Sequence, residues 1–359
     1  MSISRFSVHT RLIALTLCLG VATAVSTVSA QERDSFRIAW SIYVGWMPWG
    51  YGDAEGIVQK WADKYDIEID VVQINDYIES INQYTFGDFD ACVMTNMDAL
   101  TIPAASGVDS TALIVGSFSN GNDGLILKGA DSLEAIKGQS INMVELSVTH
   151  YVLARALESI GLSERDVRVV NTSDADLVAV AANPNVTAVG TWNPLLNEIL
   201  SMPDTNLVFH SGQIPGEVID LLVVNTETIE QYPAFAKALT GAWYETMARM
   251  MDDAATAAEA RTALGLAAGT DLQGYEQQLS TTEMFYLPAD AVDFVTSETP
   301  LETMRRVAEF SFAHGLLGDG APNAEFIGIE TPAGIYGNPD NIKLRFTDRF
   351  TRMAADGEL

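Results

Sequence analysis

The chain has 359 residues, 48% of them hydrophobic, and a formal net charge of −28 at pH 7. This acidity argues against nucleic acids and anionic membrane surfaces as partners, because both require a basic footprint. The length suffices for two lobes with a full hydrophobic core. The charge has two interpretations, a solvated acidic surface or a field that attracts a cationic solute.

The first thirty residues are predicted to be a signal peptide rather than part of the fold. Two arginines make a basic start, the apolar run 12–25 follows, and the triplet 28–30 fits the small-x-small rule for signal peptidase. The run is shorter than the roughly 20 apolar residues of a membrane span. We expect cleavage after Ala30 and a soluble periplasmic product, with a lipid anchor at Cys18 as the alternative.

After cleavage Cys92 is the remaining cysteine, so no internal disulfide can form. An exported protein without disulfides fits the bacterial periplasm better than a eukaryotic secretory route. Cys92 lies in an apolar run, and we expect its thiol to be buried and inert.

Short strand-like runs alternate with longer helical patterns, which is typical of an α/β fold with mostly parallel sheets. In the first part of the chain the expected strands are 36–40, 67–74, 90–94 and 111–115. The expected helices there are 53–65, 76–85 and 97–106.

The turn-rich stretch 119–124 predicts a crossing into a second α/β unit. Its expected strands are 125–128, 139–144, 166–171, 186–190 and 207–210, and its expected helices are 132–136, 147–160, 174–182 and 194–201. Run 218–225 predicts the strand that returns to the first unit, and 230–359 is expected to be mainly helical. The predicted domains are therefore lobe 1, formed by 31–120 and 218–359, and lobe 2, formed by 121–217.

Two comparable units joined by two crossings place a cleft between them. In open α/β sheets the ligand lies at the carboxyl ends of the strands. The loops after the strands are therefore the candidate site.

Several segments of the chain resemble one family of binding proteins. The segments D-S-L-E-A-I-K-G-Q-S-I-N-M-V-E-L-S-V-T-H-Y-V-L-A-R-A-L-E-S-I-G-L (131–162), T-W-N-P (191–194) and F-D-A-C-V-M-T-N-M-D-A-L (89–100) resemble the nitrate, sulfonate and thiamine-pyrimidine solute-binding proteins of ABC transporters. The resemblance implies a type II periplasmic binding protein fold with the ligand cleft between two lobes. It also implies a monomeric receptor that delivers its solute to an ABC permease in the inner membrane, with no cofactor.

Two further segments resemble a subgroup of that family. The segments A-W-S-I-Y-V-G-W-M-P-W-G-Y (39–51) and Q-I-N-D-Y-I-E-S-I-N-Q-Y (73–84) are similar to the solute-binding proteins associated with urea carboxylase operons. That operon type implies guanidine, urea or a related small nitrogen compound as the ligand.

The loops expected to line the cleft contain no Lys or Arg but several acids and aromatic residues. The loops are 40–53, 94–98, 117–124, 142–150, 190–198 and 214–220. An anion site usually uses a basic group, whereas a planar cation needs carboxylates along its edge and aromatic rings against its faces. The composition thus favours guanidinium over the anions of the family. Urea remains open, because its carbonyl oxygen needs only one additional donor.

Aromatic candidates for the ligand site are Tyr43, Trp46, Trp49 and Trp192. The first three lie in a Gly/Pro-broken loop, where core packing does not easily explain three large rings. Trp192 and the neighbouring Asn193 end a strand just before Pro194, a good first helical residue.

Acidic candidates are Asp98, Asp123, Glu145 and Asp220, and each also has a structural interpretation. Asp98 can cap the helix that follows, Asp123 is an ordinary turn residue, and Glu145 suits a helix N-terminus. Asp220 lies within an apolar strand, where a charge needs a partner, and a bound cation is one candidate.

Enzymatic functions find little support in the sequence. There is no Walker loop, no G-x-G-x-x-G and no H-E-x-x-H motif, and the cysteine-rich iron motif of the thiamine-pyrimidine synthase that shares this fold family is absent. The chain has four histidines, of which His314 lies far from the candidate loops and His150 is expected to be an ordinary helix residue, so no metal site is predicted. A pyrimidine-type binding protein or enzyme and a chemosensory receptor on the same fold stay as alternatives.

Overall fold

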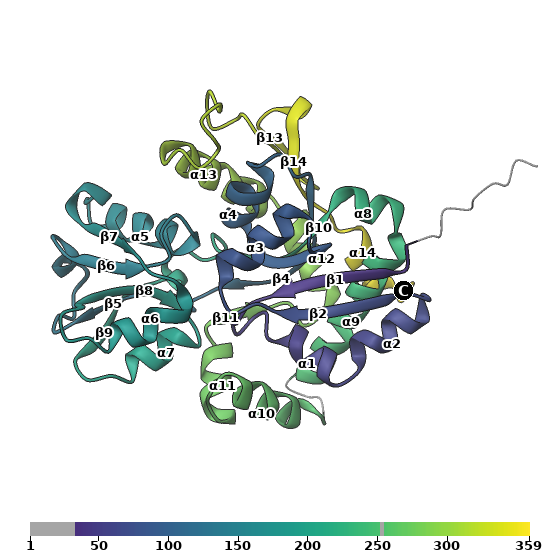
Figure 1. The fold of residues 1–359 in the computed structure, drawn as a ribbon, viewed down its shortest axis with the longest axis horizontal. Helices are drawn as coiled ribbons and strands as arrows, with labels where there is room; N and C mark the ends of the chain where they lie inside the picture. Colours follow the sequence, from purple (N-terminus) through teal and green to yellow (C-terminus); the bar gives the residue numbers. More distant parts are fainter. Residues whose placement is uncertain (1–32, 252–254) are drawn as a thin grey trace, which may run out of the picture. The chain divides into compact units, whose positions relative to one another are not determined.

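A computed structural model describes residues 33–251 and 255–359 of the chain. The signal peptide predicted at 1–30 lies outside the described residues. Residues 34–359 form one unit, whose elements are labelled in Figure 1.

The larger of two sheets has nine strands in the order β13-β12-β14-β4-β10-β3-β1-β2, and β11 pairs with β4. We call the part of the chain built on this sheet the first lobe. Its strands are β1 (Ser35–Trp40), β2 (Glu68–Gln73), β3 (Ala91–Thr95), β4 (Ser110–Ser119), β10 (Ile219–Asn225), β11 (Thr282–Met284), β12 (Gly328–Thr331), β13 (Gly334–Tyr336) and β14 (Ile342–Phe346).

The smaller sheet has five strands in the order β7-β6-β8-β5-β9, and the part of the chain built on it is the second lobe. Its strands are β5 (Asp123–Lys128), β6 (Ser140–Met143), β7 (Arg168–Asn171), β8 (Ala188–Trp192) and β9 (Thr205–His210). Figure 1 shows this sheet in teal with its helices around it.

Helices cover both sheets. Those of the second lobe are η2 (Leu133–Ile136), α5 (Val148–Ser159), η3 (Glu164–Asp166), α6 (Asp174–Ala181), α7 (Leu195–Leu200) and η4 (Ser211–Gln213). Those of the first lobe are α1 (Pro48–Ala54), α2 (Ile57–Lys64), α3 (Tyr77–Phe86), α4 (Asn96–Ala99), η1 (Leu100–Ala104), α8 (Thr226–Gln231), α9 (Pro233–Met250), α10 (Ala257–Ala267), α11 (Leu272–Leu279), α12 (Pro288–Thr296), α13 (Thr299–Ala313), η5 (Pro339–Asn341) and α14 (Arg349–Asp356).

Local sequence explains where the helices next to the cleft begin. The Asp76 side chain accepts a hydrogen bond from the Glu79 amide and caps α3, which ends at Gly87 with a φ of 88°. Ser147 caps α5 in the same way by accepting from the Thr149 amide. These caps hold the starts of α3 and α5 at the ends of β2 and β6.

Two connections link the lobes, residues 120–122 between β4 and β5 and residues 211–218 between β9 and β10. The hydroxyl oxygens of Ser119 and Ser211 are 2.6 Å apart, and the amide of Gly121 donates to the same Ser211 oxygen at 2.8 Å. Gly121 has a φ of 121°, a conformation open to glycine. The two connections therefore support each other where a hinge would lie.

Residues 230–359 are mainly helical, as expected, but they also contribute β11 to β14 to the large sheet, and these strands were not predicted. Two expectations need correction. The sheets are mixed rather than mostly parallel, since β10 runs antiparallel to β3 and β4, and β5 runs antiparallel to β8 and β9. The stretch 40–53 is not only loop, because α1 begins at Pro48. Short strands such as β11 to β14 show no clear alternation of apolar and polar residues, so the sequence gives little local indication of them.

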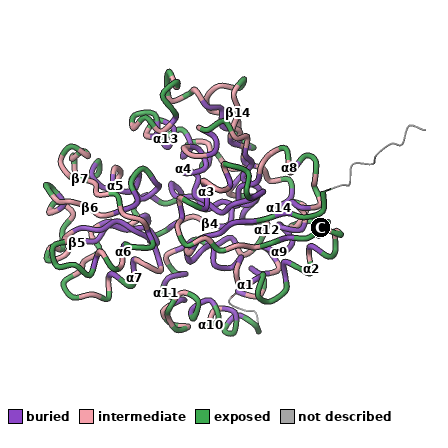
Figure 2. The backbone as a smooth tube through the Cα atoms, in the orientation of Figure 1, coloured by how far each residue is buried: buried purple, intermediate pink, exposed green. Residues whose placement is uncertain are grey.

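The central strands β3, β4 and β10 are almost wholly buried, whereas edge strands such as β7 and β13 are not; Figure 2 shows buried residues in the interior of both lobes. Cys92 is fully buried there, as expected, and burial raises the pKa of its thiol to about 12, which disfavours the reactive thiolate. Within the described ranges no helix combines the length and hydropathy that a membrane crossing requires.

Candidate functional site

The polar ends of the strands of both sheets meet between the lobes. Asp220 is the second residue of β10, and because β10 is antiparallel to its neighbours it pairs with Thr95 at the end of β3 and Ser117 near the end of β4. On the second sheet Asp123 opens β5 and pairs with Trp192 at the end of β8. This topology brings residues far apart in the sequence to one place.

Asp220 is 2% exposed, and one of its two carboxyl oxygens is fully engaged. Oδ2 accepts hydrogen bonds from the Ser117 hydroxyl at 2.6 Å and the Tyr43 hydroxyl at 3.0 Å. Oδ1 has no hydrogen-bond partner among the described residues. A buried oxygen without a partner is costly, so Asp220 retains the capacity to bind a donor.

Asp123 and Asp98 repeat this pattern. Asp98 Oδ2 accepts from the Tyr77 hydroxyl at 2.6 Å and the Thr95 hydroxyl at 2.8 Å. Asp98 Oδ1 and Asp123 Oδ2 are buried and have no hydrogen bond of acceptable geometry within the described ranges, although the amide of Val148 lies close enough to Asp98 to lower its pKa. Three buried carboxyl groups thus each keep one oxygen available.

Burial raises the pKa of each of these acids above its ordinary value, because desolvation disfavours the charged form. The pKa of Asp98 is raised to about 6. That of Asp123 is raised to about 7 by burial and, in addition, by the charge of Asp98. That of Asp220 is raised to about 8 by burial and, in addition, by the charge of Asp123. No Lys or Arg contributes to any of the three, so no basic side chain compensates their charge when they ionise.

Aromatic rings form a continuous wall beside these acids. The ring centroids of Tyr43 and Trp46 are 4.8 Å apart, those of Trp46 and Tyr77 are 5.3 Å apart, and those of Tyr77 and Trp192 are 5.7 Å apart. The indole N–H of Trp192 donates to the carbonyl of Ile42 in the first lobe at 3.2 Å. The indole N–H of Trp46 has no acceptor among the described residues.

The wall and the acids enclose a cavity of about 10 Å³, close to the roughly 10–15 Å³ that hold one water molecule. It is lined by Tyr43, Trp46, Tyr77, Thr95, Asp123, Val148, Trp192 and Asp220. None of these residues is basic. The arrangement suits a small cation that donates hydrogen bonds and has flat faces.

Five predicted site residues line this cavity, namely Tyr43, Trp46, Asp123, Trp192 and Asp220. A sixth, Asp98, bonds to two lining residues, Tyr77 and Thr95. Their contact with a ligand remains a prediction.

Three predicted site residues lie elsewhere. Trp49 stacks on Trp243 with centroids 5.2 Å apart and does not line the cavity, because α1 turns its side chain into the core of the first lobe. Glu145 is exposed to solvent at the start of the α5 loop. Asn193 is buried, but its side-chain oxygen is occupied by a hydrogen bond from the Asn197 amide of α7 at 3.0 Å.

Sequence reasoning missed Tyr77, Thr95 and Val148. Tyr77 follows β2, and the loop after β2 is not among the candidate loops although β2 ends at the same sheet edge. Thr95 was inside a candidate loop but carried no distinctive chemistry. Val148 contributes an apolar surface, which no motif marks.

The described residues also bring His150, Glu164 and His314 together, with their ligand atoms within 4.8 Å of one another. This group was not expected, because Glu164 and His314 are 150 residues apart in the sequence. It does not belong to the cavity lining.

No family model matches the chain. The taurine-binding periplasmic protein of Escherichia coli K12 is 25% identical over 144 residues, which are 39% of this chain and 44% of that protein. The match therefore spans less than half of the curated relative.

Solved structures match over most of the chain. The alkanesulfonate-binding protein SsuA of Xanthomonas axonopodis pv. citri, bound to MOPS, has a TM-score of 0.66 at 16% identity and covers 81% of this chain and 96% of its own. The aliphatic sulphonate-binding SsuA of Escherichia coli has a TM-score of 0.62 at 15% identity, covering 79% and 88%. The periplasmic nitrate-binding protein NrtA of Synechocystis has a TM-score of 0.58 at 10% identity, covering 91% and 99%. The two-lobed periplasmic binding protein fold is thereby confirmed.

Proposed function

We propose that this chain is the periplasmic solute-binding component of an ABC importer and that its solute is guanidinium or a similarly small planar nitrogen cation. The receptor role rests on the fold and on the named neighbours, which bind taurine, sulfonates or nitrate and are binding proteins rather than enzymes. The choice of solute rests on the cavity.

The observation that supports a cation is the set of three buried acids with one available oxygen each and no basic partner. A bound cation would compensate their charge and fill the missing hydrogen bonds in one step. Aromatic faces add about 0.5–2 kcal/mol of cation–π attraction, more when the site is dry. An anion would be repelled by whichever of these carboxyl groups are ionised.

The size of the cavity limits the solute. At about 10 Å³ it leaves no room for a sulfonate or a pyrimidine without a wide opening of the lobes. Guanidinium has only four heavy atoms, so a slight parting of the two sheets would admit it. We infer that the lobes close around it by hinge motion at residues 120–122 and 211–218.

Contacts between the lobes support such closure around the ligand. The Val44 amide donates to the Asn193 carbonyl at 3.3 Å, and the Ser173 hydroxyl donates to Asp76 at 2.7 Å. These bonds join the loop after β1 and the start of α3 to the second lobe. The closed form would then be the one that docks on a membrane permease.

Urea is the second candidate, and a specific observation favours it. Its carbonyl oxygen needs a donor, which the unpaired indole N–H of Trp46 or a protonated Asp220 could supply. Urea is neutral, however, and would leave any ionised acid uncompensated.

The test is isothermal titration calorimetry of the mature chain with guanidinium, urea, ammonium, nitrate and taurine. We expect guanidinium to bind most tightly. Asp220→Asn should weaken binding more than about 100-fold, as expected when a buried charge-assisted pair is removed. Glu145→Gln serves as the matched control and should leave affinity unchanged, because Glu145 is exposed. Binding of nitrate or taurine in preference to guanidinium would contradict the proposal.

The importer role needs a separate measurement. A strain that lacks this chain should lose uptake of labelled guanidine at low external concentration, and the native chain should restore it. If the Asp220→Asn variant restored guanidine uptake as well, the proposed role of the cavity in transport would be contradicted.

A further inference from the structure

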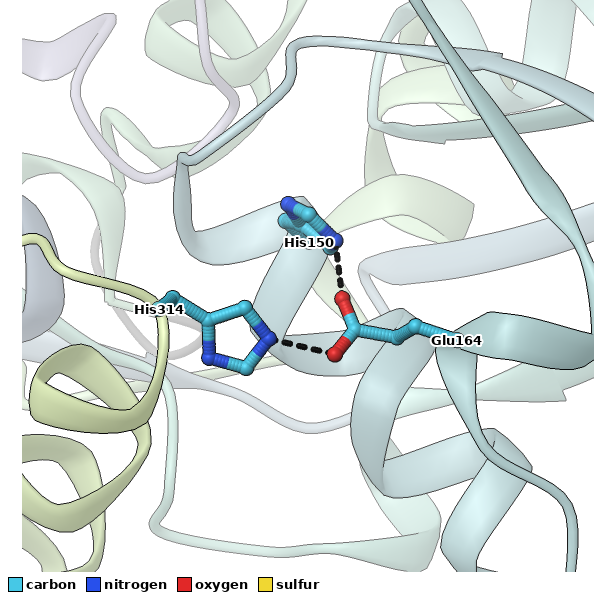
Figure 3. Close-up of side chains that lie close together, drawn as sticks. All are labelled: His150, Glu164 and His314. Atoms are coloured by element: carbon cyan, nitrogen blue, oxygen red, sulfur yellow. Dashed lines mark hydrogen bonds and ion pairs between the residues drawn. The ribbon is translucent and has the colours of Figure 1, made fainter.

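A second cluster of chemically active side chains joins the two lobes outside the cavity. His150 lies in α5 and Glu164 begins η3, both in the second lobe, whereas His314 follows α13 in the first lobe. Figure 3 shows the carboxylate of Glu164 between the two imidazole rings. Glu164 Oε1 contacts His150 Nε2 and Glu164 Oε2 contacts His314 Nε2.

The hydrogen bonds of His314 decide what can lie between it and Glu164. His314 Nδ1 is 2.8 Å from the carbonyl oxygen of Phe310, and only an N–H can bond to a carbonyl. A neutral ring therefore carries its proton on Nδ1 and turns the Nε2 lone pair toward the carboxylate. Two lone pairs at contact distance require a positive charge between them, either a proton or a metal ion.

His150 offers a second nitrogen to the same point. The residue is 5% exposed, and its Nε2 has no hydrogen bond of acceptable geometry within the described ranges despite its contact with Glu164. A buried ring nitrogen that contacts a carboxylate but makes no proper hydrogen bond with it is poorly satisfied. A cation bound by both groups would satisfy it.

We infer that His150, Glu164 and His314 form a binding site for a divalent transition metal ion, Zn²⁺ being the best fit. Two imidazoles and one carboxylate are a common set of ligands for zinc, with a fourth position left to water. The bond from His314 Nδ1 to the Phe310 carbonyl is the outer contact that orients metal-binding histidines. The ligand atoms, all within 4.8 Å of one another, are close enough to share one ion.

A single local change completes the coordination of His150. The Leu146 amide donates to His150 Nδ1 at 3.2 Å, so metal at Nε2 requires the ring proton to move to Nδ1. Leu146 has a φ of 64°, which leucine rarely adopts. A turn of the peptide between Glu145 and Leu146 would relieve that φ and offer the Glu145 carbonyl to the Nδ1 proton.

The ion has a route from solvent. A cavity of about 610 Å³ lies between α5 and α13 and is lined in part by Glu164, Arg155 and Arg306. Arg155 and Arg306 are both paired with the buried Glu217, which reduces their repulsion of a cation.

Because its ligands come from both lobes, the ion would hold the lobes closed. If guanidinium also favours the closed form, which rests on the proposed function, metal and solute should each raise the affinity of the other by the same factor. The metal site itself does not depend on that proposal.

The test is calorimetric titration of Zn²⁺ into the untagged, metal-stripped mature chain. We expect one Zn²⁺ per chain, and more than about ten-fold weaker binding in His314→Ala and Glu164→Gln, since removal of even an outer contact costs 10–100-fold. Controls are His210→Ala and Glu158→Gln, a histidine outside the cluster and an exposed acid beside it, which should bind Zn²⁺ as the native chain does. Co²⁺ should report nitrogen ligation by its visible absorption.

Four outcomes decide the assignment. Zn²⁺ binding that is lost in both cluster variants and kept in both controls supports it, whether or not guanidinium binds. Absence of Zn²⁺ binding to the native chain overturns it, as does equal binding by all variants. Small-angle scattering that shows lobe opening in His314→Ala without any Zn²⁺ effect also overturns it and identifies a hydrogen-bonded latch instead. His314 is partly exposed, so its variant should fold.

Discussion

The affinity for guanidinium should rise with pH, because protons compete with the cation for the same carboxyl groups. Raising the pH from 6 to 8 is the perturbation, and Asp123 and Asp220 are the groups that respond, with pKa values of about 7 and about 8 in the free protein. Guanidinium itself stays charged over this range, as the guanidinium group of arginine does.

The magnitude follows from proton linkage. If the complex requires Asp123 to be ionised, its affinity rises about 10-fold between pH 6 and 8, since a group with a pKa of about 7 loses most of its proton there. If Asp220 must ionise as well, a further factor of about 50 follows from its pKa of about 8. We therefore expect an increase of at least about 10-fold.

The assay is calorimetry at several pH values in pairs of buffers with different ionisation enthalpies, which counts the protons released on binding. Guanidinium should release between about 0.5 protons, if only Asp123 must ionise, and about 1.4 protons, if Asp220 must ionise as well, at pH 7. Urea should release none and should bind more weakly as Asp220 loses its proton. A guanidinium affinity that is flat or falls from pH 6 to 8 would refute the assignment of these carboxyl groups to the site.

Three further predictions follow from the same geometry. Asp220→Asn should stabilise the ligand-free protein by up to roughly 4 kcal/mol at pH 7, because it removes a buried acid whose pKa is raised to about 8. Urea denaturation measures this change, and a loss of stability would mean that the carboxyl group is well compensated. The ligand-free native chain should lose stability as the pH rises from 5 to 8. The raised pKa values of Asp98, Asp123 and Asp220 mean that the folded state binds more protons than the unfolded state over this range. Chemical denaturation should therefore show a falling free energy of unfolding, and a rising one would contradict the burial argument. Trp192→Leu should weaken guanidinium binding by about 2- to 30-fold, which corresponds to the free energy of a cation–π contact. Trp49→Phe should leave the affinity unchanged, since Trp49 stacks on Trp243 outside the cavity. Calorimetric titrations that show equal effects of both variants would contradict a role of the aromatic wall in binding.

Much of the fold was predictable from local patterns. The strand at 67–74 was expected from the alternation of its apolar residues and is observed as β2 (Glu68–Gln73), and the helix expected at 147–160 is observed as α5 (Val148–Ser159) with its Ser147 cap. Such elements depend on neighbours within a few residues, so the sequence carries their signal. The strands β11 to β14 were missed because each is too short to show a clear alternation of apolar residues.

The chemistry of the candidate site was predictable from the sequence, but only some of the residues that form the site were. The excess of acids and tryptophans in the loops indicated a cation, yet the same composition included Glu145, which is exposed, and Trp49, which is packed in the core. A residue type at a strand end shows what it could bind. Its side-chain direction depends on the packing of the whole lobe.

The sequence by itself determined the alternation of strands and helices, the acidity of the chain and the absence of basic residues from the candidate loops, because these are properties of short segments. Only the tertiary structure decided that Asp98, Asp123 and Asp220 meet between the lobes. Asp98 and Asp220 belong to the first lobe, whereas Asp123 begins a strand of the second sheet. It also decided that His150, Glu164 and His314 form one cluster. Long-range pairing of β10 between β3 and β4, and packing of α13 near α5, fix these positions, and no local pattern encodes either.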